Sequence, residues 1–191
     1  MAIREDQRKS PYSVLSSRSI YANPWISVRE DRVIRPDGKE AVFGLIEMRA
    51  GSTVLAMDGQ CQVYLVREYK LAVERHSMEL ISGGLAEGET ALDAAKRELR
   101  EEVGLQAKEW IDLGVVDPFT TVVRSPNHIF LALGICEGNR SPEPGEILDI
   151  VKVPFRQAVD MVMNSVITHA ASCVAILKAE QYLRERGQLP S

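Results

Sequence analysis

The chain has 191 residues, of which 45% are hydrophobic and 26% are charged, and this composition predicts one compact domain or one domain with a small appendage. No apolar run approaches the roughly 18 residues that a membrane helix requires, and the formal net charge of −4 argues against a nucleic acid partner, which normally requires a basic patch. The charged start lacks the apolar segment of a secretory signal, so we expect a cytoplasmic protein with no membrane partner. The three cysteines are far apart and form no CxxC spacing, so neither a disulfide framework nor a zinc site is predicted.

The first part of the chain is predicted to consist mainly of strands. Residues 1–19 show little periodicity, which is typical of a loosely held arm. From Ile20 onward, strand-like runs lead into a turn at residues 36–38, and we interpret this region as a β-hairpin that ends near Met48. Two more strands are predicted at residues 53–57 and 62–67, because an Asp-Gly turn signal separates them.

After Ser82 the spacing of apolar residues changes to that of a helix. The apolar positions are Leu92, Ala95, Leu99 and Val103. Their intervals of three and four residues predict an amphipathic helix with one buried stripe. Thr90 with Asp93 approximates a capping box, and Gly104 can take the left-handed conformation that ends a helix. We therefore predict a helix from Thr90 to Val103.

The remainder of the chain is predicted to contain two strands and two helices. The strands lie at residues 110–116 and 128–135, joined by a loop at 117–127, and a second loop is expected at 142–145. Helical composition and spacing follow at residues 154–164 and 170–186. This order of elements indicates an α/β (α+β) fold in which a mixed β-sheet is flanked by helices.

The predicted helix is part of a longer pattern of fixed residues. From Gly83 the sequence reads Gly, five residues, Glu, seven residues, Arg-Glu, an aliphatic residue, any residue, Glu-Glu, any residue, Gly and an aliphatic residue. The specified positions are Gly83, Glu89, Arg97, Glu98, Leu99, Glu101, Glu102, Gly104 and Leu105. At a given starting point, such a match would arise by chance on the order of once in 10⁹. The pattern is therefore specific.

Three carboxylates of this pattern share one surface of the helix. Glu98 and Glu102 are four residues apart, which places their Cβ atoms about 5–6 Å from each other, and Glu101 flanks the same surface. Hard divalent cations would remove the repulsion among them, since these ions prefer carboxylate oxygens and bridge to substrate phosphates. Arg97 can pair with Glu101 one turn later and orient it. A helix so rich in charge could also be a solvated face, but the fixed glycines and Glu89 argue against that reading.

The turn before the helix fits the same interpretation. Ser82, Gly83 and Gly84 form a segment in which the absence of Cβ atoms lets the backbone approach a metal ion or a phosphate. Glu89 lies at the start of the helix, where the helix dipole favours a carboxylate and backbone N–H groups can bind it.

With this pattern the chain resembles the Nudix hydrolase family, and in particular its ADP-ribose and nucleoside diphosphate sugar pyrophosphatases, over roughly residues 21–182. Residues 23–48 resemble the N-terminal β region of these enzymes, and residues 63–85 resemble the strand and loop that precede the Nudix box. The resemblance implies a Nudix fold, with an N-terminal β region at residues 1–50 and a hydrolase domain at residues 51–191. It also implies a homodimer in which the N-terminal strands cross to the partner.

The resemblance further implies which residues form the site. The metal ligands would be the carbonyl of Ser82 and the carboxylates of Glu98, Glu101 and Glu102, with Mg²⁺, or Mn²⁺ in its place, as the cofactor. The catalytic residues would be Arg97, Glu101 and Glu102. Arg67 matches an arginine that binds substrate phosphate, and arginine suits that role through its planar, permanently charged fork. Glu79 matches an acidic position that supports the metal or ribose site, and Arg124 is suited to holding a phosphate.

One loop departs from the pattern of the ADP-ribose pyrophosphatases. These enzymes commonly carry a glutamate on the loop after the strand that follows the box, where it helps to activate the attacking water. The corresponding residues 117–130 of this chain contain no glutamate. The general base therefore stays open among Glu101, Glu102 and a carboxylate of the later loop that contains Glu143 and Glu146.

The sequence as a whole predicts metal-dependent hydrolysis of the pyrophosphate bond of ADP-ribose or a nucleotide sugar, which releases a nucleoside monophosphate and a sugar phosphate. One alternative is a regulator that binds a nucleotide sugar without cleaving it, although the box is intact. The other is a Nudix hydrolase of different nucleoside polyphosphates, such as triphosphates, dinucleoside polyphosphates or capped RNA. The sequence specifies neither the base nor the sugar, because these depend on loops and on the partner subunit.

Overall fold

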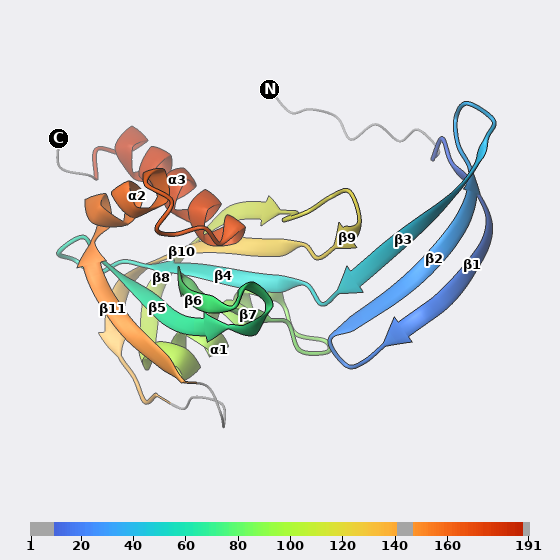
Figure 1. Ribbon diagram of the computed structural model, residues 1–191. Coiled ribbons are helices and arrows are strands. Elements are labelled where there is room, and N and C mark those ends of the chain that lie inside the picture. The colour runs from blue at the N-terminus through green and yellow to red at the C-terminus, as the bar shows by residue number, and fades with distance from the viewer. Residues whose placement is uncertain (1–9, 141–146, 189–191) are drawn as a thin grey trace. The chain divides into compact units, whose positions relative to one another are not determined.

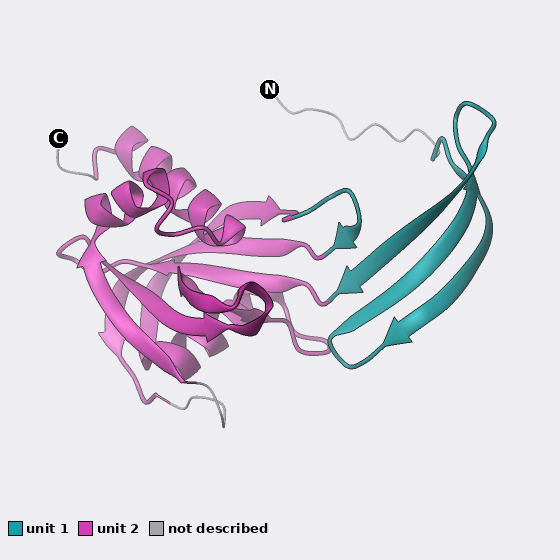
Figure 2. Ribbon diagram, viewed as in Figure 1, with its two compact units in different colours: residues 1–48, 119–124 teal, residues 49–118, 125–191 magenta. Residues whose placement is uncertain are grey.

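The computed structural model describes residues 10–140 and 147–188 (Figure 1). The predicted loop at residues 142–145 therefore lies outside the described residues. The chain divides into two compact units (Figure 2). Unit 1 comprises residues 1–48 and 119–124, and unit 2 comprises residues 49–118 and 125–191. Among the described residues, no helix is long and apolar enough to cross a membrane.

Unit 1 is built around a four-stranded sheet. Its strands, in spatial order, are β1 (Ser13–Ala22), β2 (Ile26–Ile34), β3 (Glu40–Met48) and the short β9 (Val123–Arg124). The predicted hairpin is confirmed, because β2 and β3 pair antiparallel from Ile26 opposite Met48 to Ile34 opposite Glu40. Gly38 lies between these strands with a φ of 80°, a left-handed conformation that glycine adopts at little cost.

Two predictions for unit 1 are wrong. The loosely held arm expected at residues 1–19 includes most of β1, which pairs antiparallel with β2. Every residue of β1 is exposed, so this strand lacks the one-sided apolar alternation by which a half-buried strand is recognised. The loop expected at residues 117–127 contains β9, which pairs in parallel with β3. Two residues are too few to show any period.

Unit 2 contains two sheets. The order of the first is β7 (Ile81–Gly84), β4 (Gly51–Ala56), β10 (Asn127–Glu137) and β8 (Leu105–Val116), and the order of the second is β11 (Leu148–Pro154), β5 (Gln62–Lys70) and β6 (Arg75–Glu79). The first sheet is mixed, because β4 runs parallel to β10 while the other pairs are antiparallel. A short 3₁₀ helix, η1 (Leu71–Val73), joins β5 to β6.

Helices cover both faces of the mixed sheet (Figure 1). They are α1 (Ala91–Val103), α2 (Phe155–Met163) and α3 (Ala170–Glu185), close to the three predicted helices. Successive side chains of a strand point to opposite faces, and in β4 Val54 packs in one apolar cluster with Leu99 of α1, whereas Leu55 packs in another with Ile176 of α3. The predicted α/β (α+β) fold, with a mixed sheet sandwiched between helices, is confirmed.

Candidate active site

Helix α1 begins and ends where the sequence predicts. The hydroxyl of Thr90 accepts a hydrogen bond from the backbone N–H of Asp93 at 3.1 Å and donates one to its carboxylate at 2.7 Å. Gly104 follows the last turn with a φ of 70°. The buried face of the helix carries Ala94, Ala95, Glu98, Leu99, Glu102 and Val103. Two glutamates of the box thus lie on the apolar face, where unpaired charge is costly.

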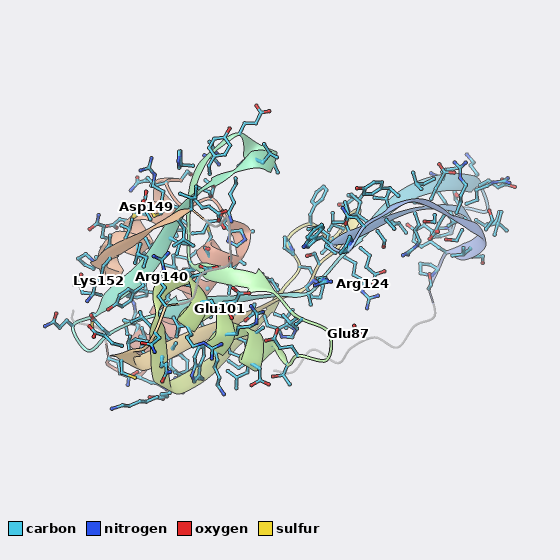
Figure 3. The ribbon with its side chains drawn as sticks, turned by 90° about the horizontal axis from the view of Figure 1, so that it is seen from below. Glu87, Glu101, Arg124, Arg140, Asp149 and Lys152 are labelled. Atoms are coloured by element: carbon cyan, nitrogen blue, oxygen red, sulfur yellow. The ribbon has the colours of Figure 1, made fainter. Side chains whose placement is uncertain are left out.

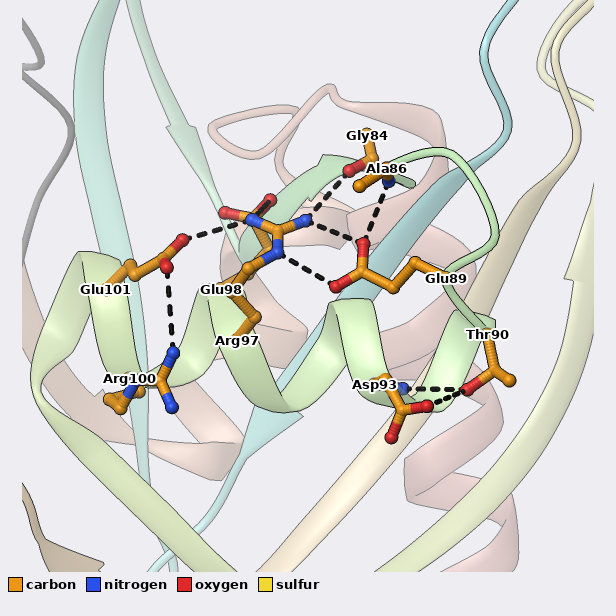
Figure 4. Close-up of polar contacts among 9 residues, drawn as sticks. All are labelled: Gly84, Ala86, Glu89, Thr90, Asp93, Arg97, Glu98, Arg100 and Glu101. Carbon is orange, nitrogen blue, oxygen red and sulfur yellow. Dashed lines mark hydrogen bonds and ion pairs between the residues drawn. The ribbon is translucent and has the colours of Figure 1, made fainter.

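Arg97 connects the carboxylates of the box (Figure 4). Its guanidinium group donates two parallel hydrogen bonds to Glu89, at 2.9 and 3.0 Å. The Nη1 atom also donates to Glu98 at 2.7 Å and to Glu101 at 3.0 Å, and Nη2 donates to the carbonyl of Gly84 at 3.0 Å. The predicted pair of Arg97 with Glu101 is confirmed. A single arginine therefore joins the turn before α1 to the carboxylates on the helix.

The two partners in the bidentate pair stabilise each other's charged form. The hydrogen bonds to Arg97 hold the pKa of Glu89 below its ordinary value, and the backbone N–H of Ala86 lowers it further. The same hydrogen bonds raise the pKa of Arg97 above its already high value. Glu89 therefore anchors the guanidinium at the start of the helix, which leaves Arg97 oriented toward Glu98 and Glu101.

The first glycine of the box gives room to a carboxylate. A Cβ atom on Gly83 would lie 1.8 Å from Oε1 of Glu98 and 2.1 Å from its Cδ, whereas a Cβ atom on Gly84 would meet nothing within 4 Å. Only a residue without a side chain at position 83 leaves the Glu98 carboxylate where it is. Ser82 lies next to it in β7, opposite Thr53 of β4.

The chemistry of these residues fits a hard divalent cation. Such ions bind carboxylate and carbonyl oxygens. Glu98, Glu101 and Glu102 lie within two turns of α1, and the carboxylate of Glu98 lies close to Gly83. Among the described residues, no three acidic, histidine or cysteine side chains already converge on one point as ligands of an ion would. Arg97 orients two of the three carboxylates, so ion binding at this site would require them to reorient.

A partly exposed lysine, Lys70, lies among further acidic residues on β5 and β6. Lys70 donates a hydrogen bond to Glu68 at 2.5 Å. Although burial lowers the pKa of Lys70, this bond and the negative charges of Glu79 and Glu102 raise it above its ordinary value. Sequence analysis did not single out Lys70. The alternation of β5 was the available signal, because it places Lys70 and Glu68 on the face opposite Arg67.

The start of α3 is tied to the same region. The backbone N–H of Leu80 donates to the hydroxyl of Ser172 at 2.9 Å, and this hydroxyl is 2.9 Å from Nδ1 of His169. The same ring nitrogen is 3.6 Å from a carboxylate oxygen of Glu79. Burial lowers the pKa of His169, Lys70 lowers it further, and Glu79 opposes both. The pKa of His169 is therefore below its ordinary value, and its Nδ1 shares a hydrogen bond with the hydroxyl of Ser172.

Arg67 and Arg124, two further predicted residues, each have an acidic partner within their own unit. Arg67 is half-exposed on β5, and its guanidinium is 4.0 Å from Asp149 of β11. Arg124 belongs to unit 1, where it contacts Glu47 at 3.2 Å and is 79% exposed. Figure 3 labels Arg124, which belongs to unit 1, and Asp149, which belongs to unit 2. Glu143 and Glu146, the alternative general bases, lie outside the described residues.

Arg140, another residue that sequence analysis missed, contacts the last turn of α1. The side chain of Arg140 donates a hydrogen bond to the carbonyl of Glu102 at 2.7 Å, a favourable position for a cation because the last carbonyls of a helix lack partners within it. The contact spans 38 residues, so no local spacing in the sequence indicates it.

Comparisons with known proteins identify the family and the fold of the chain. A model of the nucleoside diphosphate sugar hydrolase N-terminal domain matches residues 13–46, and a model of the NUDIX domain matches residues 47–170. The chain is 26% identical to an ADP-ribose pyrophosphatase of Bacillus subtilis, over 92% of this chain and 94% of the relative. It is 28% identical to an ADP-ribose pyrophosphatase of Mycobacterium tuberculosis, over 87% and 82%. The solved structure of an ADP compounds hydrolase shares the fold, with a TM-score of 0.81, 21% identity and coverage of 93% and 97%.

The lowered pKa of His169 predicts how stability depends on pH. The folded state disfavours the charged ring, so the unfolded state binds more protons at pH values near and below 6.5, and the free energy of unfolding should fall as the pH is lowered through this window. In His169→Asn, which keeps a good N-cap residue, the decrease between about pH 7.5 and about pH 5.5 should be smaller. Urea denaturation at each pH measures it. The exposed His76→Asn is the control and should follow the wild type, and equal slopes in all three proteins would contradict the prediction.

Proposed function

Because this chain belongs to the Nudix family, as a hydrolase with the N-terminal domain of the nucleoside diphosphate sugar hydrolases, we propose that it cleaves the pyrophosphate bond of ADP-ribose or a nucleotide sugar. The products would be a nucleoside monophosphate and a sugar phosphate. The observation that carries this proposal is the contact of Arg97 with Glu89, Glu98 and Glu101, since it organises the carboxylates of an intact box at one end of a glycine turn.

The proposed cofactor is Mg²⁺, with Mn²⁺ as a substitute. Glu98, Glu101, Glu102 and the carbonyl of Ser82 would hold the ion, which would offset the charge of the diphosphate and make water a better nucleophile. Gly83 supports this role because it keeps space for the Glu98 carboxylate. Arg97 supports it by keeping Glu98 and Glu101 close to each other on the helix, from where both could turn toward an ion.

The reaction needs one proton acceptor and groups that bind the diphosphate. A water oxygen forms a bond to one phosphorus, the bridging P–O bond breaks, and the water proton passes to a carboxylate. Glu101 and Glu102 are the described candidates for this general base, alongside Glu143 and Glu146. Arg97, which the sequence predicts as a catalytic residue, would act as a positioning residue by holding Glu101.

Substrate contacts are proposed for three further residues. Arg67 and Arg124 present half-exposed and exposed guanidinium groups, which suit phosphate oxygens, and Glu79 lies where its charge acts on Lys70 together with that of Glu102. ADP-ribose is favoured within this substrate class by the names of two relatives that span most of the chain. We propose that the protein acts in the cytoplasm on this small molecule.

A substrate panel tests the proposed reaction. Wild type and Glu102→Gln are assayed for monophosphate release from ADP-ribose, ADP-glucose, GDP-mannose, UDP-glucose and a nucleoside triphosphate, with Mg²⁺ or Mn²⁺. We expect monophosphate release from at least one diphosphate sugar. In the variant the rate of release should fall roughly a hundredfold or more, because metal ligands and the groups that orient them commonly contribute factors of this size to activity. Glu87→Gln, at an exposed position before α1, is the control. Binding without turnover would favour a regulator, and cleavage of the triphosphate alone would contradict the proposed substrate class.

We further propose that the N-terminal segment, residues 1–50, assembles the protein as a homodimer, with residues 51–191 carrying the hydrolase. In unit 1 the sheet ends at β1, whose ten residues are all exposed. An exposed edge strand offers unpaired backbone groups to another chain. Large exposed apolar side chains lie on β1 and elsewhere in the same unit, namely Tyr12, Val14, Leu15, Ile20, Tyr21, Trp25 and Val42. A second copy of the chain would cover them.

Sedimentation equilibrium tests the dimer. The wild type should have twice the 21.2 kDa mass of the chain, and Ile20→Lys should shift the equilibrium toward the monomer, because it places a charge on the apolar edge. Met163→Lys, an exposed position on α2, is the matched control and should remain dimeric. A monomeric wild type would refute the assembly without bearing on the hydrolysis.

A further inference from the structure

A cavity in unit 2 lies on the side of α1 opposite the buried glutamates Glu98 and Glu102. Its volume is about 240 Å³, and its walls are Lys96 and Arg100 from α1 with Gln106, Ala107 and Trp110 from β8. Lys96 and Arg100 are four residues apart, so they project from the same side of the helix. Both are exposed, whereas Glu98 and Glu102 are buried on the other side. The cavity is therefore separate from the carboxylates of the box.

The lining of this cavity is suited to a flat anion. Among the residues that the structure describes, five line it: two are cations, one is an amide, one is an indole and none is acidic. Trp110 is half-buried, and its ring meets the ring of Phe130 edge-on, with centroids 6.4 Å apart. This contact holds the indole at the cavity wall, so that a ligand ring could stack on it without having to order it first.

The size and charge of the cavity together select a ligand class. Arginine and lysine bind phosphate oxygens by charge-assisted hydrogen bonds, and a nucleobase stacks readily on an aromatic side chain. Ligand cavities usually measure about 300–1,000 Å³, and this cavity, at about 240 Å³, lies below that range. Its volume therefore limits the ligand to one nucleotide at most and excludes a whole diphosphate sugar. We propose that this cavity is a binding site for a nucleoside monophosphate, with the phosphate between Lys96 and Arg100 and the base on Trp110.

Arg100, which lines the cavity, also contacts Glu101 of the box. Arg100 Nη2 is 3.7 Å from one oxygen of Glu101, and the other oxygen of Glu101 accepts the hydrogen bond from Arg97 (Figure 4). A phosphate that binds Arg100 competes with Glu101 for that guanidinium group. Occupation of the cavity therefore changes the charge balance at Glu101, and the bound monophosphate acts as a regulator of the active site.

Intrinsic fluorescence tests the site directly, because the chain has two tryptophans. Trp25 is 67% exposed and lies in unit 1, so Trp25→Phe leaves Trp110 as the single reporter in an intact chain. The full-length variant is titrated with AMP, adenosine and inorganic phosphate in the presence of EDTA, which removes any ion that could hold AMP at the box. We expect AMP to change the Trp110 emission saturably, with adenosine and phosphate each binding at least roughly tenfold more weakly, since each lacks one of the two contacts.

Two further variants locate the response. In the Trp25→Phe background, Lys96→Gln should weaken AMP binding by roughly tenfold, whereas Lys108→Gln, an exposed lysine of β8 outside the cavity, should leave it unchanged. No saturable change, or equal affinity in Lys96→Gln and Lys108→Gln, would overturn the proposal. These titrations involve no turnover, so their outcome is distinct from that of the proposed hydrolysis.

Discussion

The contacts of Arg97 are the constraint on which the rest of the site depends. Carboxylates on the apolar face of a helix are costly unless a cation pairs with them, and α1 buries Glu98 and Glu102 while it carries Glu101 beside them. Arg97 offsets this cost for two of the three and binds Glu89 through two parallel hydrogen bonds. Its bond to the carbonyl of Gly84 extends the same restraint to β7. Strand, turn and helix are thereby held as one unit, with the carboxylates of the box close to one another on α1.

The fold could be predicted wherever short-range signals determine it. The hairpin of β2 and β3 has a clear turn, and α1 has a capping box at one end and a glycine at the other. Strand β1 could not be predicted, because it buries no side chain and its pairing partner alone defines it. The short strands β6 and β7 have five and four residues. Pairing with neighbouring strands determines them, so no alternation of apolar residues in the sequence indicates where they lie.

The candidate site follows the same division between local and distant contacts. The pair of Arg97 with Glu101 spans one turn and was predicted from spacing. The glycines were predicted to let the backbone approach a metal ion or a phosphate, and the room that Gly83 leaves for the carboxylate of Glu98 was not predicted. The contact of His169 with Glu79 spans 90 positions of the chain and depends on how α3 packs, so only the fold shows it. Lys70 was missed because sequence analysis did not ask to which face of β5 each charged side chain points. Lys70 points to the face opposite that of Arg67.

Binding of Mn²⁺, followed by electron paramagnetic resonance, tests most directly the claim that the oriented carboxylates of α1 form a metal site. Wild type is compared with Glu98→Gln and with Glu87→Gln, which changes an exposed glutamate outside the contacts of Arg97. The account predicts that Glu98→Gln binds Mn²⁺ at least roughly tenfold more weakly, while Glu87→Gln binds it as the wild type does. Equal Mn²⁺ affinity in the wild type and Glu98→Gln would contradict the account, because the ion would then bind elsewhere.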